Sequence, residues 1–148
     1  MLEKQGDLFE SGCDLLCVTT NGIVKPNNEL VMGKSIALQF KEKWPELPRM
    51  FGACVKRYGN LPAIALTRDF KQKVASIPTK NHYKDDSDPA LIVRSITKLV
   101  SLIDAYEDKN WIKTIALTRP GCGNGGLQWE HVKKMIESLL DDRFTVYY

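Results

Sequence analysis

The chain has 148 residues, and we expect one domain over residues 1–148 because single cores are usually of this size. Its 43% hydrophobic and 26% charged residues indicate a globular protein whose core needs no disulfide or metal to hold it. The net charge of +3 permits an anionic ligand but argues against the dense basic patch of a typical nucleic-acid-binding protein.

Targeting and metal signals are also absent from the sequence. No apolar run approaches the roughly 20 residues of a membrane span, and Met1–Gly12 lacks the layout of a secretion signal. The 4 cysteines form no Cys-x-x-Cys pair and have no histidine at zinc-ligand spacing, so we expect free thiols and no bound metal. Reduced thiols indicate a cytoplasmic protein, and without coiled-coil heptads we expect a monomer.

Strand and helix patterns alternate along the chain. In order, they predict a strand buried on both faces at Asp14–Thr20, a loop at Asn21–Asn28, helices at Lys34–Trp44 and Pro48–Tyr58, and short strands at Ala63–Thr67 and Val74–Pro78. They then predict a polar loop at Thr79–Ser87, a long amphipathic helix from Leu91 to Tyr106, a strand at Ile112–Leu117, a helix at Gln128–Leu140 and a final strand at Phe144–Tyr148. The last of these helices is expected to turn Val132, Met135, Ile136, Leu139 and Leu140 inward. This alternation implies a layered α/β fold with a largely parallel sheet.

The segment Pro120–Leu127 (PGCGNGGL) lies between a predicted strand and a predicted helix. Its glycines allow the backbone to approach a ligand closely, and successive N–H groups beside a helix start form a site for an anion such as a diphosphate. A tight turn without a ligand is the alternative interpretation, but four glycines in six residues favour the ligand.

Gly121, Gly123 and Gly126 also match the G-x-G-x-x-G pattern of dinucleotide-binding Rossmann domains. That motif belongs to the first strand–helix–strand unit and is followed by an acidic residue and further strands. Here only one strand follows, ending in Tyr147 and Tyr148, so we reject a Rossmann fold.

Several motifs, taken in order, resemble the macro domains. They are Gly6-Asp7-Leu8 before the first buried strand, Asn21 after it, Met32–Ala37 (MGKSIA) at a helix start, and PGCGNGGLQW later in the chain. The resemblance extends from about Gly6 to the C-terminus and implies a three-layer α/β/α fold with a mixed, largely parallel central sheet. Within the family, the motifs MGKSIALQFKEKWPE, IPTKNH and GCGNGGLQWEHV are most similar to the branch of the human terminal ADP-ribose glycohydrolase and of the antitoxin that reverses DNA ADP-ribosylation.

The resemblance implies that ADP-ribose binds without any further cofactor. Asp7 would accept a hydrogen bond from the adenine amino group beside the Leu8 backbone, and Asn21 would bind the distal ribose hydroxyls. Taken alone, Asp7 is typical of a turn or cap, and Asn21-Gly22 is a common turn dipeptide. Tyr147 would stack on adenine, although a tyrosine on a final strand is equally typical of packing. The diphosphate would lie between two loops, the first formed by Gly33, Lys34, Ser35, Ile36 and Ala37 and the second by Pro120, Gly121, Cys122, Gly123, Asn124, Gly125, Gly126 and Leu127.

The sequence departs from the family pattern at three places. Val18 stands where many members have the first of two asparagines, and the segment Val24–Leu30 lengthens a loop that would act as a lid or add substrate contacts. Gly125 stands where the human-type glycohydrolase has a catalytic aspartate, so the two-residue mechanism of that enzyme does not transfer to this chain.

Lys80, in the segment Ile77–His82 (IPTKNH), is the residue that we predict to be catalytic, with Asn21 orienting the ribose. Its amine would either attack the open-chain aldehyde of the distal ribose to give a Schiff base, or polarise and position the leaving group. The first role requires a neutral amine, which burial or nearby positive charge favours. A solvated lysine in a polar loop is the alternative interpretation.

Three other side chains are weaker candidates for catalysis. His82 would be a general base near neutral pH, but a loop histidine more often makes a local hydrogen bond. His131 is expected at the surface. Cys122 has no histidine placed to activate it, and we interpret it as a small loop residue.

Three classes of function follow from the resemblance. The first is a hydrolase that releases ADP-ribose from DNA or protein by means of Lys80. The second is a phosphatase acting on ADP-ribose 1″-phosphate, and the third is a non-catalytic reader of ADP-ribose. A module that binds RNA or poly(ADP-ribose) is a fourth class, against which the modest net charge argues.

Overall fold

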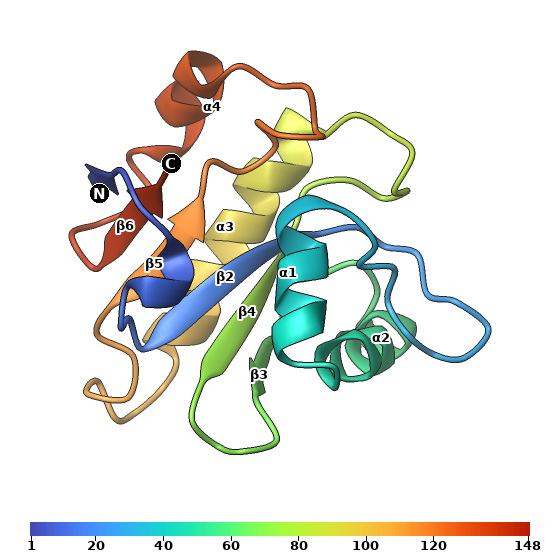
Figure 1. Cartoon of the computed structure of the whole chain (residues 1–148). Coiled ribbons are helices and arrows are strands. Elements are labelled where there is room, and N and C mark those ends of the chain that lie inside the picture. Colours follow the sequence, from blue (N-terminus) through green and yellow to red (C-terminus); the bar gives the residue numbers. More distant parts are fainter.

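The computed structural model describes all of residues 1–148 and consists of a six-stranded sheet between helices (Figure 1). The strands are β1 (Leu2–Lys4), β2 (Leu15–Thr20), β3 (Ile64–Leu66), β4 (Lys73–Pro78), β5 (Ile115–Thr118) and β6 (Phe144–Tyr147). The helices are the 3₁₀ turn η1 (Leu8–Glu10) and the α-helices α1 (Ser35–Lys43), α2 (Leu47–Tyr58), α3 (Pro89–Asp104) and α4 (Trp129–Ile136). The order across the sheet is β1-β6-β5-β2-β4-β3, and every pair is parallel except β3 with β4. The predicted layered, mixed and largely parallel sheet is thus confirmed.

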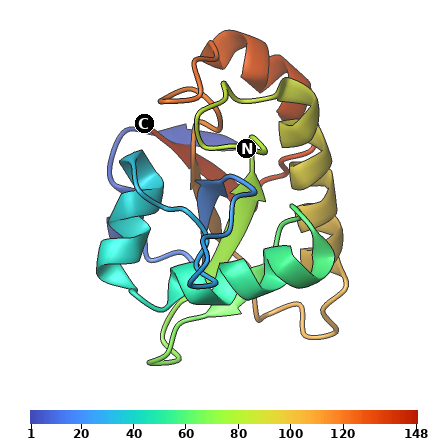
Figure 2. The same ribbon diagram turned by 90° about the vertical axis from the view of Figure 1, so that its right-hand side faces the viewer.

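Strand β2 explains why the sheet needs helices on both sides. Alternate residues of a strand point to opposite faces, and the first four residues of β2, Leu15–Val18, are apolar and buried on both faces. Leu15 and Cys17 pack in a core with α3 and α4, whereas Leu16 and Val18 pack in a second core with α1 and α2. Figure 2 shows the sheet between α1 on one side and α3 on the other.

No helix combines the length and the apolar character needed to span a membrane.

Three details differ from the sequence-based prediction. Strand β1 was not expected; all three of its residues are exposed, so it lacks the alternating pattern, and its pairing with β6 creates it. The predicted helix Gln128–Leu140 ends as an α-helix at Ile136, and Met135 is 36% exposed rather than turned inward. Most other bounds move by only a few residues.

The segment Val24–Leu30 docks on α2. Val24 and Leu30 form an isolated antiparallel bridge, and the Leu30 N–H donates to the Pro48 carbonyl at 2.8 Å. The Lys56 ammonium donates to Asn28 Oδ1 at 2.6 Å. None of the residues of this segment lines the large cavity described below, so in this structure the segment lies against α2, and a role as a lid or in substrate contacts stays a prediction.

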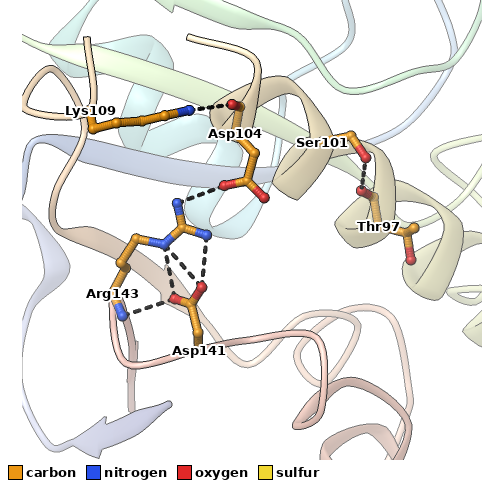
Figure 3. A network of polar contacts seen from close by, with 6 residues as sticks. All are labelled: Thr97, Ser101, Asp104, Lys109, Asp141 and Arg143. Carbon is orange, nitrogen blue, oxygen red and sulfur yellow. Dashed lines mark hydrogen bonds and ion pairs between the residues drawn. The ribbon is translucent and has the colours of Figure 1, made fainter. Parts of the chain in front are cut away.

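An arginine ties the end of α3 to the start of β6 (Figure 3). Arg143 makes a two-pronged contact with Asp141, with its Nη2 at 2.7 Å from Asp141 Oδ2, and its Nη1 lies 2.9 Å from Asp104 Oδ1. The hydrogen bonds from Arg143 lower the pKa of the Asp141 carboxyl group, and those same bonds raise the pKa of the guanidinium. This contact fixes the connection that leads into the last strand.

Candidate functional site

One large cavity, about 1220 Å³ in volume, opens at the carboxyl ends of the parallel strands. Its walls include Thr20 at the end of β2, Thr79 just after β4, Thr118 at the end of β5 and Tyr147 at the end of β6. Ligands of open α/β sheets bind at this edge, because the loops that follow the strands converge there. The volume is large enough for a dinucleotide-sized ligand.

Both predicted phosphate loops line this cavity and touch each other. Asn124 Nδ2 in the second loop donates to Ser35 Oγ in the first at 2.8 Å, across 89 residues of sequence. Ser35 has a φ of 51°, a left-handed conformation that is rare outside glycine and asparagine. Backbone strain of this kind persists where the surrounding structure imposes it, commonly at ligand sites.

The second loop is shaped by backbone contacts around Gly125. The Ser87 N–H donates to the Gly125 carbonyl at 3.0 Å, and the Leu127 N–H donates to the Gly121 carbonyl at 2.9 Å. A β-carbon at residue 125 would overlap both Ser87 Oγ and the Gly121 carbonyl oxygen. This position therefore admits only glycine in the observed backbone, and an aspartate would not fit there.

Asn21 faces the cavity but already has protein partners. Its side-chain amide donates to the Val31 carbonyl at 2.9 Å and accepts from the Ile23 N–H at 2.9 Å, and the residue is only 9% exposed. These are the local contacts of the turn interpretation of Asn21. Each polar atom of an amide can form a second hydrogen bond, so these contacts leave capacity for a ribose hydroxyl.

Lys80 lies on a loop that borders the cavity from the side of β4. The base of this loop is closed by the Asp88 N–H, which donates to the Thr79 carbonyl at 2.8 Å. Lys80, Tyr83, Lys84 and Asp86 of the loop all line the cavity. None of the five ion pairs in the structure involves Lys80, so its ammonium group is not tied to a carboxylate.

His82 makes a local hydrogen bond, which is the alternative to a role as general base. Its Nδ1 accepts from the Lys84 N–H at 3.1 Å, and its ring lies 4.3 Å from that of Tyr83. His82 does not line the cavity, whereas Lys80 does. His131 is exposed, as predicted.

The predicted adenine-binding residues are divided between the cavity and its surroundings. Asp7 Oδ1 accepts from the Phe9 N–H at 2.9 Å and caps η1, and Leu8 is buried. Neither Asp7 nor Leu8 lines the cavity. Of the predicted residues of the second loop, Pro120 and Gly126 do not line it either. Asp7 thus has the cap contact of its alternative interpretation.

Both C-terminal tyrosines line the cavity, but only Tyr148 is exposed. Tyr147 is 7% exposed and packs in the core beneath α1 and α2; burial raises the pKa of its hydroxyl. Tyr148 is 54% exposed, and the Arg119 guanidinium carbon lies 4.3 Å from its ring centroid. The sequence-based prediction named Tyr147 and missed Tyr148 and Arg119, although Arg119 follows a buried strand directly and so had to lie at this edge of the sheet.

Unpaired polar atoms gather around the cavity. Three buried side-chain atoms in the structure have no hydrogen-bond partner: Ser87 Oγ, Arg119 Nε and Asn60 Oδ1. Ser87 and Arg119 line the cavity, and Asn60 contacts the backbone of Lys80. Because buried polar groups are usually paired, such a gathering is typical of a functional site.

Cys122 is unsuited to nucleophilic chemistry. Burial raises the pKa of its thiol, and Sγ donates to the Pro120 carbonyl at 3.5 Å. A raised pKa reduces the fraction of reactive thiolate. The interpretation of Cys122 as a small loop residue agrees with these contacts.

No group of three or more His, Cys, Asp or Glu residues is arranged to hold a metal ion.

Fold and site together define an α/β domain whose two predicted phosphate loops meet at the carboxyl edge of its sheet. The family model described as "Macro domain" matches residues 25–136 of this chain. The chain therefore belongs to the macro domain family. The resemblance inferred from the motifs is thereby confirmed.

Relatives with known names add detail. The chain is 34% identical over 140 residues to the DNA ADP-ribosyl glycohydrolase of Mycobacterium tuberculosis, a match that covers 91% of this chain and 37% of that protein. It is 26% identical over 155 residues to the human ADP-ribose glycohydrolase OARD1, covering 97% of this chain and 88% of that protein. This chain thus spans little more than a third of the bacterial relative and most of the human one.

Solved structures agree with the sequence comparison. The macrodomain of Mycobacterium tuberculosis DarG superposes with a TM-score of 0.80 at 28% identity, covering 99% of this chain and 95% of that chain. Thermosipho africanus DarTG in complex with ADP-ribose gives a TM-score of 0.77 at 26% identity, covering 96% of this chain and 39% of the other.

Proposed function

We propose that this domain binds ADP-ribose in the large cavity and hydrolyses the bond that joins ADP-ribose to a macromolecule, either DNA or protein. The observation that carries the proposal is that Lys80 and both glycine-containing loops line one cavity. The two relatives described above are named as glycohydrolases of ADP-ribosyl or ADP-ribose groups, and these names support the same activity.

In this proposal the diphosphate lies between residues 33–37 and 121–127, where main-chain N–H groups at a helix start favour an anion. Asn21 binds the distal ribose with its remaining hydrogen-bonding capacity. Tyr147, or the more exposed Tyr148, contacts adenine, with Asp7 and Leu8 near the adenine end.

Lys80 then acts at the anomeric carbon of the distal ribose. As a nucleophile, its neutral amine bonds to this carbon while the bond to the macromolecule breaks and the leaving group takes up the proton of the amine. The lysine–ribose adduct then opens its ribose ring to the Schiff base, and water hydrolyses this imine, which releases ADP-ribose and restores the amine. As an electrostatic group, the ammonium instead polarises the leaving group while water attacks.

The test is release of ADP-ribose from ADP-ribosylated DNA and, separately, from ADP-ribosylated protein. Lys80→Ala is expected to abolish release while calorimetry gives an almost unchanged Kd for ADP-ribose. Lys98→Ala, at an exposed position on α3, is the matched control. Lys80→Arg keeps the charge but lacks a nucleophilic amine, so retained release would select the electrostatic role, and borohydride trapping of an adduct would select the covalent one.

Other outcomes point to the other classes. Release by Lys80→Ala at the wild-type rate would refute the assignment. Phosphate release from ADP-ribose 1″-phosphate alone would indicate a phosphatase, and binding without any turnover would indicate a reader. The proposal includes a monomer acting in the cytoplasm, a compartment with which the four free thiols are compatible.

A further inference from the structure

Asn60 connects the end of α2 to the backbone of Lys80. Its Nδ2 donates to the Lys80 carbonyl at 3.1 Å and to Asn81 Oδ1 at 3.0 Å. Asn60 lies two residues after the end of α2, and the two hydrogen bonds span 20 and 21 residues of sequence. One side-chain amide therefore holds two successive residues of the loop that carries the predicted catalytic lysine.

The turn after β2 holds the same loop from another direction. The Gly22 N–H donates to the Asn81 carbonyl at 2.9 Å. A β-carbon on Gly22 would lie 2.9 Å from both Cγ and Nδ2 of Asn60, closer than real β-carbons approach other atoms. Glycine at residue 22 thus allows Asn60 to reach the Lys80 carbonyl, so three chain segments meet at this point.

The remaining polar atom of Asn60 distinguishes this contact from ordinary packing. Asn60 Oδ1 is buried and has no hydrogen-bond partner, an unfavourable state for a carbonyl group. Asn60 thus keeps its two donor hydrogen bonds to the loop although its acceptor atom is left unpaired. The side-chain nitrogen of Asn60 donates one hydrogen bond to Lys80 and one to Asn81.

The side chain of Lys80 has little else to locate it. Its ammonium belongs to none of the ion pairs of the structure, and a lysine side chain has many rotamers. The position from which the amine enters the cavity therefore depends on the Lys80 backbone. Displacement of a reacting group by about 1 Å can slow catalysis by roughly 100-fold.

We propose that Asn60 is a positioning residue that fixes the Lys80 backbone so that the amine reaches the anomeric carbon. The inference rests on the catalytic role proposed above for Lys80. Asn60 itself does not line the cavity. It is thus expected to affect the rate of release and to leave ADP-ribose affinity unchanged.

Two substitutions test this role. Asn60→Ala removes both donors, and Asn60→Asp keeps the shape of the side chain but replaces the donating nitrogen by an oxygen. Asn110→Asp makes the same chemical change at an exposed position outside the cavity lining. Both Asn60 variants are expected to lower kcat for ADP-ribose release by roughly 10- to 100-fold with the Kd for ADP-ribose unchanged, whereas the Asn110 variant behaves as the wild type.

Amide hydrogen exchange supplies a readout that does not depend on activity. Loss of the Asn60 donors is expected to speed exchange at the Gly22 N–H, which donates to Asn81, and to leave exchange unchanged at the Val132 N–H within α4. Unchanged exchange at Gly22 would overturn the proposed anchoring.

The outcomes separate this inference from the proposed function. Wild-type release by both Asn60 variants, with Lys80→Ala inactive, overturns the positioning role and leaves the catalytic role of Lys80 intact. Wild-type release by Lys80→Ala overturns both. A fall in ADP-ribose affinity or melting temperature that matches the fall in release overturns the positioning role, because it assigns Asn60 to general stability.

Discussion

Asn124 Nδ2 lies 2.8 Å from Ser35 Oγ, and this hydrogen bond closes the contact between the two loops that border the cavity. Both side chains are exposed; Asn124 belongs to the second loop, and Ser35 is the first residue of α1. Their contact joins the two segments directly, and preorganisation of this kind reduces the ordering cost wherever a ligand binds.

Loss of this hydrogen bond should weaken ligand binding. Ser35→Ala and Asn124→Ala are each expected to cost about 0.5–1.5 kcal/mol, or roughly 2- to 10-fold in the Kd for ADP-ribose. Calorimetry on the single and double variants measures the coupling, and the double variant should bind no more weakly than the weaker single variant. Strictly additive losses would contradict a direct contact between the two side chains.

Gly125→Ala should destabilise the fold. The new methyl group would overlap Ser87 Oγ and the Gly121 carbonyl, and overpacking of this kind costs about 1–3 kcal/mol. Gly123→Ala is the matched control for stability, because a β-carbon at residue 123 meets nothing within 4 Å. Thermal melting of the two variants provides the comparison.

Gly125→Asp carries the same steric penalty and so should not create a more active two-residue enzyme. If this variant folded like the wild type and released ADP-ribose faster, the steric argument at residue 125 would be wrong.

Cys122→Ser should retain ADP-ribose release within about 3-fold of the wild type, since the raised pKa of the thiol leaves little thiolate to act as a nucleophile. Cys17 has its thiol pKa raised further because it is completely buried. A thiol reagent at neutral pH should therefore label neither residue quickly in the folded protein. Abolition of release by Cys122→Ser would require a mechanism other than one based on Lys80.

Acid should weaken the connection around Arg143. The pKa of Asp141 is lowered in the folded state from its ordinary value of 3.8, chiefly by hydrogen bonds from Arg143. A lowered folded-state pKa stabilises the protein above pH 3.8, and this contribution is lost as the pH falls through the lower folded value.

Denaturant unfolding at several pH values checks this prediction. Asp141→Asn should be less stable than the wild type at pH 7, and the difference should shrink below about pH 4. Asp142→Asn, one residue along and without an ion pair, is the control. A difference that stayed constant down to pH 2 would mean that the carboxylate charge plays no part.

The sequence was sufficient for features whose cause is local. The run Asp14–Thr20 predicted a strand buried on both faces, because burial of alternate residues depends only on the period of the strand, and β2 occupies Leu15–Thr20. The glycines of Pro120–Leu127 predicted a loop that approaches a ligand, because freedom from β-carbon clashes belongs to the residue itself. The first loop, Gly33–Ala37, followed from the family motif; it lines the same cavity as the second loop and contacts it through Ser35.

Features that depend on distant partners were beyond reach of the sequence. Strand β1 is exposed and has no pattern of its own, and it exists because Leu2–Lys4 pairs with β6 at the other end of the chain. The side chain of Asn60 could be linked to Lys80 only once α2 and β4 were placed in space. Hydrogen bonds and side-chain overlaps act over about 3 Å, so chain position alone does not determine which residues meet in this way.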